Sequence, residues 1–179
     1  MSSIVALAGS PSTESRTVAL LRHIAGSLDG HDVHVVPVRA LPADALLGAD
    51  TADPAISAVV RQVTDADGLI VASPVYKAAY SGVLKTFLDL LPANALAGKA
   101  VLPVLTGAAP VHALAVDYAL RPVLAALGAR HVVQGLFLID KQIERTPDGV
   151  VLAPDVQASV DAAVDGLTSA LPGVLTVRS

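Results

Sequence analysis

A segment rich in hydroxyl groups follows the first apolar run of the chain. Residues 9–17 read Gly-Ser-Pro-Ser-Thr-Glu-Ser-Arg-Thr and connect the run Ile4–Ala8 to a helical pattern. Backbone N–H groups and the dipole at a helix N-terminus attract anions, and Ser10, Ser15 and Thr17 can add hydroxyl donors. The segment therefore predicts a site for a phosphate monoester, although serine and threonine are also ordinary helix caps. It is neither a dinucleotide G-x-G-x-x-G pattern nor a Walker loop, because the second glycine and the Gly-Lys pair are missing.

A second group of side chains that can hold a ligand follows another apolar run, Gly68–Ala72. The loop that follows this run contains a proline, which stiffens the turn, and two of the three tyrosines of the chain. The tyrosines can offer ring edges and hydroxyls to a planar ligand. Surface tyrosines are the alternative interpretation. The candidate residues of this loop are Pro74, Val75, Tyr76, Lys77 and Tyr80.

A third candidate loop, which includes Thr106, Gly107 and Ala108, follows the run Ala100–Leu105. A glycine lets the backbone approach a ligand closely, and its N–H groups can face the pyrimidine edge of a flavin. Negative charge stabilised there favours the reduced flavin, so the protein can tune a flavin without side-chain catalysis. His112 is expected near this rim, where a capping or solvent-facing histidine is equally compatible with the sequence. The other histidines show no metal-ligand spacing, so no metal site is predicted.

The elements that must position these loops alternate regularly along the chain. Five short apolar runs predict buried parallel strands, and five amphipathic stripes predict the helices between them. The pattern indicates an α/β fold, a flavodoxin-like doubly wound five-stranded parallel sheet of order 2-1-3-4-5 with helices on both faces. In that order the switch point lies between strands one and three, so the first two loops should converge on one crevice. The strands are expected at Ile4–Ala8, Val33–Val38, Gly68–Ala72, Ala100–Leu105 and His131–Ile139.

Prolines mark two of the expected helices. Asp53 precedes Pro54, which predicts an N-cap followed by proline at the first helical position. The helix expected from about Val111 to Leu127 contains Pro122, which cannot donate to the carbonyl of the preceding turn. Either a plain proline kink or a one-turn π-bulge would satisfy the backbone there, and π-bulges often mark functional or interface sites. Residues 41–52 are expected to form an irregular surface loop.

Composition limits the class of protein. The chain has 179 residues, of which 53% are hydrophobic and only 3% aromatic, which suits one α/β domain spanning residues 1–179 with a core of Ala, Val and Leu. The net charge of −4 without a basic cluster argues against nucleic acid and anionic membranes as partners. Without cysteine, disulfides and thiol redox chemistry are excluded, so electron transfer requires a borrowed cofactor. Ile4–Ala8 lacks the basic flank of a signal peptide, so a soluble, cytoplasmic protein is expected.

Two longer blocks of sequence resemble the NADPH-dependent FMN reductase family, particularly the reductase components of two-component alkanesulfonate monooxygenase systems. The resemblance extends from Ile4 to about Phe137. The blocks are residues 71–86, which include the Ser-Pro-Val-Tyr-Lys-Ala-Ala-Tyr-Ser-Gly segment, and residues 115–124, Ala-Val-Asp-Tyr-Ala-Leu-Arg-Pro-Val-Leu.

The resemblance implies FMN and NADPH as cofactors, with the FMN phosphate on the loop of Ser10, Ser15 and Thr17. It places the flavin ring against residues 74–77 and residues 106–108. It also implies a homodimer or homotetramer in which the helix of Tyr118 lies at a subunit interface. Members of the family commonly carry an arginine where this chain has Ser12, and Arg16 is the nearest substitute in the sequence.

Three functions follow as hypotheses. The leading one is NAD(P)H-dependent reduction of FMN by hydride transfer, with the reduced flavin released to an FMNH2-dependent monooxygenase of sulfonate or sulfur assimilation. The absence of tryptophan fits loose flavin capture. A tightly FMN-bound quinone or azo reductase is the second. The third, a flavodoxin-type electron carrier, gains little support from a net charge of −4, because such carriers dock through dense acidic surfaces.

Overall fold

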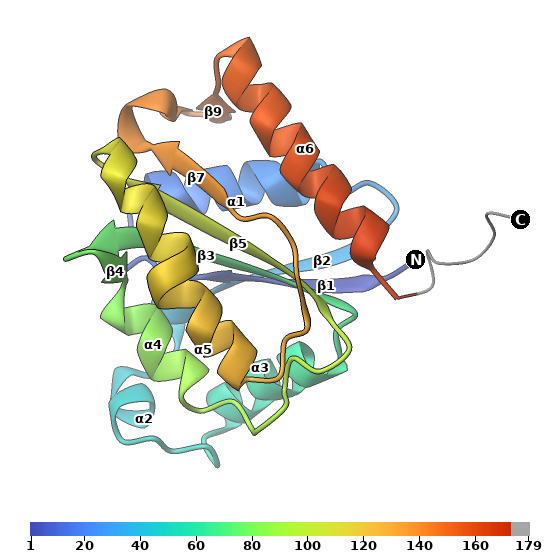
Figure 1. Ribbon diagram of the computed structural model, residues 1–179. Coiled ribbons are helices and arrows are strands. Elements are labelled where there is room, and N and C mark those ends of the chain that lie inside the picture. Colours follow the sequence, from blue (N-terminus) through green and yellow to red (C-terminus); the bar gives the residue numbers. More distant parts are fainter. Residues whose placement is uncertain (173–179) are drawn as a thin grey trace, which may run out of the picture.

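The computed structural model describes residues 1–172, so residues 173–179 of the predicted domain lie outside the described part. A parallel sheet forms its centre (Figure 1). The strands follow the order β2-β1-β3-β5, with β6 and β7 both pairing with the free edge of β5. The predicted 2-1-3-4-5 order is therefore confirmed. The parallel strands are β1 (Ser3–Ala8), β2 (Asp32–Pro37), β3 (Gly68–Tyr76), β5 (Ala100–Gly107), β6 (His131–Val132) and β7 (Leu136–Ile139).

The last position of the sheet differs from the single strand that the sequence predicts. β6 pairs with β5 up to Val132, and β7 resumes the pairing at Leu136. Pro103 of β5 lies opposite the interruption and has no N–H to donate across it. Gly135 also packs so tightly that a Cβ there would lie 2.5 Å from Val116 Cγ1. The ladder is therefore broken where the backbone of β5 offers no donor.

Helices cover both faces of the sheet, as predicted (Figure 1). Alternate residues of a strand point to opposite faces, so β1 sends Ile4 and Ala6 towards one core and Val5 and Leu7 towards the other. The first core lies under α1 (Arg16–Gly26) and α6 (Pro154–Ala170). The second lies under α3 (Pro54–Asp65), α4 (Gly82–Leu88) and α5 (Arg121–Ala126).

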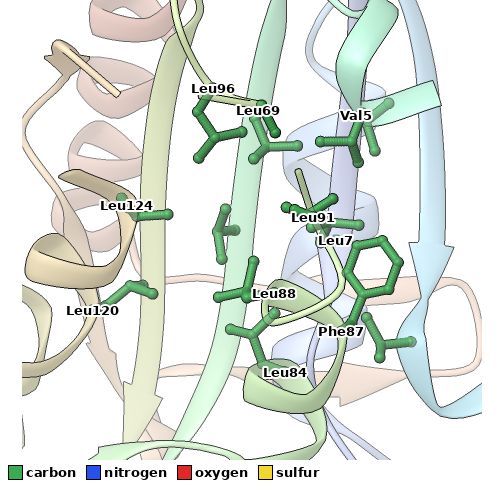
Figure 2. Close-up of a cluster of buried hydrophobic side chains, with 14 of the residues drawn as sticks. Val5, Leu7, Leu69, Leu84, Phe87, Leu88, Leu91, Leu96, Leu120 and Leu124 are labelled. Carbon is green, nitrogen blue, oxygen red and sulfur yellow. The ribbon is translucent and has the colours of Figure 1, made fainter. Parts of the chain in front are cut away.

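Leucine, valine and alanine make up all but two of the buried residues of the second core. Figure 2 shows Leu84, Phe87 and Leu88 of α4 among the side chains of β1 and β3. Phe87 is fully buried and is one of only two phenylalanines in the chain. Small and branched side chains let the helices approach the sheet closely, which positions the loops at its carboxyl edge.

The polypeptide before Pro122 forms a π-helix, η3 (Val116–Leu120), which follows a 3-10 turn, η2 (Pro110–Ala113). The N–H of Arg121 bonds to the carbonyl of Val116, five residues earlier, and α5 then begins. The structure thus selects the π-bulge over the plain kink.

The predicted capping of α3 is also confirmed, because Asp53 accepts from the N–H groups of Ala55 and Ile56.

The prediction of an irregular loop over residues 41–52 is wrong. After a 3-10 turn, η1 (Val38–Ala40), the chain forms a short helix, α2 (Ala43–Leu47), whose Ala45 and Leu46 are buried. Five residues are too few for a helical period to be visible in the sequence. Four further short elements were also not expected: β4 (Ala79–Tyr80), η4 (Asp140–Gln142) and the hairpin of β8 (Glu144–Thr146) and β9 (Gly149–Val151).

A buried lysine caps the C-terminal end of α3. Lys99 Nζ donates to the carbonyls of Thr64 and Ala66, at 2.7 and 2.6 Å, and so satisfies acceptors that the helix leaves open. Burial lowers the pKa of Lys99, and the charges of Asp65 and Asp67 oppose this effect.

Within residues 1–172 no helix combines the length and the apolar character needed to cross a membrane.

Replacing Lys99 by methionine should lower the free energy of unfolding by about 1–3 kcal/mol, because one buried and one partly buried carbonyl lose their donor. Urea unfolding followed by circular dichroism measures the change. Lys141→Met, at an exposed position, is the matched control and should be nearly neutral. Equal losses in the two variants would contradict the capping role.

Candidate functional site

The loops after β1 and β3 are joined directly by hydrogen bonds. Gly9 N donates to Ala72 O at 2.7 Å, and the hydroxyl of Ser81 donates to Gly9 O. Ser81 N in turn donates to Ser73 Oγ at 2.8 Å. A Cβ at Gly9 would lie 2.5 Å from the Cβ of Leu84, so the approach of α4 leaves room only for glycine. The structure therefore brings the first two predicted loops together at the carboxyl edge of the sheet.

The loop after β1 forms hydrogen bonds with itself. The buried hydroxyl of Ser10 accepts from Ser12 N at 3.3 Å, and Ser12 Oγ accepts from Glu14 N at 3.2 Å. Ser15 is the N-cap of α1 and accepts from Val18 N at 3.2 Å. These bonds occupy the N–H groups of Ser12, Glu14 and Val18. The other N–H groups in the first turn of this eleven-residue helix have no partner within the helix, so its N-terminus suits an anion.

Thr17 and Thr106, predicted for two different loops, touch each other. Their hydroxyl oxygens are 2.6 Å apart, and both side chains are buried. One hydroxyl donates and the other accepts, so each retains part of its bonding capacity. The contact ties the first turn of α1 to the end of β5 and brings the third loop to the same site.

The loop after β3 is a tight hairpin. β3 and β4 pair as antiparallel strands around Lys77 and Ala78, whose φ angles are 50° and 65°. Two successive left-handed residues make a primed turn, which normally uses asparagine and glycine. The hairpin places Tyr76 in a half-exposed position and buries Val75.

Other predicted residues of this hairpin differ in exposure. Pro74 and Tyr80 are half-buried, whereas Lys77 is exposed. Burial raises the pKa of Tyr80, and the positive charge of Lys85 opposes this effect. The phenol of Tyr80 therefore stays protonated at neutral pH and can donate a hydrogen bond.

The end of β5 lies against His112. A Cβ at Gly107 would lie 2.9 Å from His112 Nδ1, so a larger residue would displace the ring. His112 Nδ1 is buried, and it has no hydrogen-bond partner among the described residues. A buried polar atom of this kind is costly unless it is bonded, which makes His112 a candidate for contacting a ligand. Ala108, next to Gly107, is exposed.

A cavity of about 420 Å³ adjoins this end of the site. Tyr118 of the π-helix borders it and is 81% exposed, and Val111 and Leu114 are 64% and 57% exposed. The cavity is lined by Ala78, Val111, His112, Leu114, Ala115 and Tyr118.

The charged residues around the loop after β1 were only partly predictable. Arg16 is exposed on the first turn of α1. Two arginines that the sequence did not indicate reach the loop from distant segments. Arg39 Nε donates to Pro11 O at 3.1 Å across 28 positions, and Arg145 pairs with Glu14 across 131 positions. Spacing along the chain carries no signal for such contacts.

These features fit a ligand that is flat at one end and anionic at the other. The N-terminus of α1, next to the loop after β1, suits a phosphate, and the hairpin after β3 offers a half-exposed tyrosine ring. At the other end, His112 packs against Gly107, and the Nδ1 of His112 has no hydrogen-bond partner among the described residues. The residues present therefore fit an FMN.

The threonine pair should show strong coupling in stability. Thr17→Val alone leaves the buried Thr106 hydroxyl without its partner and should cost about 1–3 kcal/mol of unfolding free energy. The double variant Thr17→Val/Thr106→Val removes both polar groups and should be considerably more stable than the sum of the two single changes predicts. Urea unfolding of the four proteins measures this coupling. Additive losses would show that the hydroxyls do not interact.

Comparison with known proteins agrees with this geometry. The model of the family described as "NADPH-dependent FMN reductase" matches residues 2–144. An "FMN reductase (NADPH)" of Escherichia coli (strain K12) is 45% identical over 184 residues, which cover 98% of this chain and 96% of that protein. An "NADH-dependent FMN reductase SfnF" of Pseudomonas fluorescens (strain Pf0-1) is 35% identical, covering 75% and 74% of the two chains.

A solved structure shares the whole fold. The apo form of an NADH:FMN oxidoreductase, EMOB, superimposes with a TM-score of 0.89 at 40% identity, covering 99% of this chain and 94% of that chain. The resemblance found in the sequence is thereby confirmed, together with FMN and NADPH as the cofactors that the family's description names. With the family model covering most of its length, the chain belongs to the NADPH-dependent FMN reductase family.

Proposed function

We propose that this chain reduces FMN with NAD(P)H and releases the reduced flavin. The observation that carries the proposal is the meeting of three loops at one edge of the sheet, with an anion-binding surface at one end and Gly107 at the other. When bound, FMN accepts a hydride from the nicotinamide, so the chain has only to bind, align and stabilise.

The residues of the three loops divide this task. The loop after β1 and the first turn of α1 hold the phosphate, the hairpin after β3 orients the ring, and the backbone at Gly107 stabilises charge at the pyrimidine edge. His112 offers its unsatisfied Nδ1 at the same rim. The proposed binding residues are Ser10, Ser15, Arg16, Thr17, Pro74, Val75, Tyr76, Lys77, Tyr80, Thr106, Gly107, Ala108 and His112.

Two features favour release of the flavin: the chain has no tryptophan, and the loop after β1 already forms hydrogen bonds with itself. The chain has no tryptophan, so no indole can stack on the ring. The N–H groups of Ser12 and Glu14 are bonded to loop hydroxyls, so a phosphate must exchange these bonds. A receiving FMNH2-dependent monooxygenase, and its link to sulfonate or sulfur metabolism, rest on the sequence resemblance.

Steady-state kinetics with NADPH and NADH, each crossed with FMN and riboflavin, test the activity. NAD(P)H oxidation should depend on added flavin, and kcat/KM should be roughly tenfold or more lower for riboflavin, which has no phosphate to bind the loop. No oxidation with either nicotinamide would refute the proposal.

Ultrafiltration then separates the leading function from a tightly FMN-bound quinone or azo reductase. At micromolar concentration FMN should pass through the membrane while the protein is retained. Flavin that stays with the protein, together with quinone turnover faster than that of free FMN, would favour the alternative.

We also propose that the chain assembles as a homodimer or homotetramer through the face around Tyr118. Three exposed apolar side chains, Val111, Leu114 and Tyr118, gather around a cavity on this face, and large exposed apolar groups often mark an interface. The π-helix displays Tyr118 by interrupting the regular turn before α5.

Replacing Tyr118 by aspartate should shift the protein to a smaller species in sedimentation velocity, because a charge would be buried in the interface. Val151→Asp, an exposed apolar position on β9, is the control and should leave the distribution unchanged. A monomeric wild-type protein, or an unchanged assembly in Tyr118→Asp, would contradict this interface.

A further inference from the structure

The loop proposed to bind phosphate has an unfavourable charge of its own. Between Gly9 and Ser15 it carries no basic residue, and its one charged side chain is Glu14. A phosphate monoester has a charge of about −1.5 to −2 at neutral pH. The N-terminus of α1 contributes the equivalent of only about +0.5. A cation held beside the loop would therefore strengthen phosphate binding. Arg16 follows the loop directly but is exposed, and within residues 1–172 no hydrogen bond or ion pair holds its guanidinium against the loop.

One candidate cation is already neutralised. Arg145 reaches the loop from β8, and its Nη2 forms an ion pair with Glu14 Oε2. This pair cancels the carboxylate but adds no net positive charge. Arg145 therefore removes the repulsion between Glu14 and a phosphate, but it does not supply a positive charge that attracts the phosphate.

The second candidate keeps its charge. Arg39 Nε bonds to the carbonyl of Pro11, which is neutral, and none of the ion pairs within residues 1–172 involves Arg39. This bond holds the guanidinium against the loop, one residue before Ser12. The Nε bond uses one of its five N–H donors and leaves four on the two Nη atoms.

The fold explains why Arg39 arrives there. β2 pairs with β1 in parallel register, with Pro37 opposite Ala8, so both strands end at the same edge of the sheet. η1 then places Arg39 two residues beyond the end of β2, beside the loop that begins after Ala8. Parallel pairing thus brings a side chain from the second strand to the loop of the first.

We propose that Arg39 supplies the positive charge by which the site selects a flavin that carries a phosphate, while Arg145 acts only by neutralising Glu14. This inference rests on the proposed function. It names phosphorylated over unphosphorylated flavin as the preferred substrate class, and it assigns the preference to a residue outside the phosphate-loop sequence.

The test compares kcat/KM for FMN and for riboflavin in Arg39→Gln at low ionic strength, and adds FMN and riboflavin titrations followed by flavin fluorescence. Arg39→Gln should lose about tenfold with FMN in both measurements and little with riboflavin, because a charge-assisted contact to the phosphate is removed. Arg39→Lys should recover part of the loss, and added salt should narrow the difference. Arg61→Gln removes the same charge from the exposed face of α3 and is the matched control.

The role of Arg145 is tested by a cycle with Glu14. Arg145→Gln exposes the Glu14 carboxylate and should weaken FMN binding, whereas Glu14→Gln/Arg145→Gln should restore it. If Arg39→Gln affects FMN and riboflavin equally, or neither, the inference is wrong and Arg39 only braces the loop at Pro11. The same selective loss in Arg16→Gln but not in Arg39→Gln would assign the charge to Arg16 instead. If the wild-type protein reduces neither flavin, the proposed function itself is wrong. That result differs from failure of the Arg39 inference, in which the wild-type protein is active but Arg39→Gln shows no selective loss with FMN.

Discussion

Hydrogen bonds between Gly9 and two neighbouring segments hold the site together. Its N–H bonds to Ala72 in the middle of β3, and its carbonyl accepts from Ser81, which also caps α4. The position tolerates no side chain, because α4 approaches to within contact distance. The loop after β1, β3 and the start of α4 are therefore fixed relative to one another by a single residue. Any ligand held between the loops depends on that residue.

The core and the site are connected through the parallel sheet. β1, β3 and β5 are buried along nearly their whole length, so their carboxyl ends are held rigidly at one edge. Thr17 and Thr106 extend this rigidity by linking α1 to the end of β5 through buried hydroxyls. The three loops thus rest on packed elements, although each loop is itself at the surface.

Much of this architecture could be predicted from the sequence because it follows from local patterns. Apolar runs indicated the strands, Asp53-Pro54 indicated a helix start, and Pro122 indicated an irregular turn that proved to be a π-helix. The short elements escaped prediction, since α2 and the β8–β9 hairpin have too few residues for a period to appear. The interruption at Pro103 was equally invisible, because it depends on which neighbour the missing N–H would have faced.

The candidate site could likewise be predicted only in part. Residue types and their positions after strands predicted the three loops and the convergence of the first two, and the family resemblance placed the third loop with them. The partners of those residues could not be predicted: Thr17 contacts Thr106, and Arg39 and Arg145 reach the first loop across long stretches of chain. Such contacts depend on the direction of each side chain once the strands are paired, and local spacing does not encode that direction.

The hydrogen bonds within the loop after β1 have a consequence for the empty protein. Because Ser10 and Ser12 already satisfy the N–H groups of Ser12 and Glu14, the loop is ordered before any anion arrives. An incoming phosphate must displace these bonds before it can accept from the same N–H groups, so part of its binding free energy is offset. The order of the loop does not depend on a bound phosphate, so the protein can pass repeatedly through its ligand-free form without this loop opening to proteolysis.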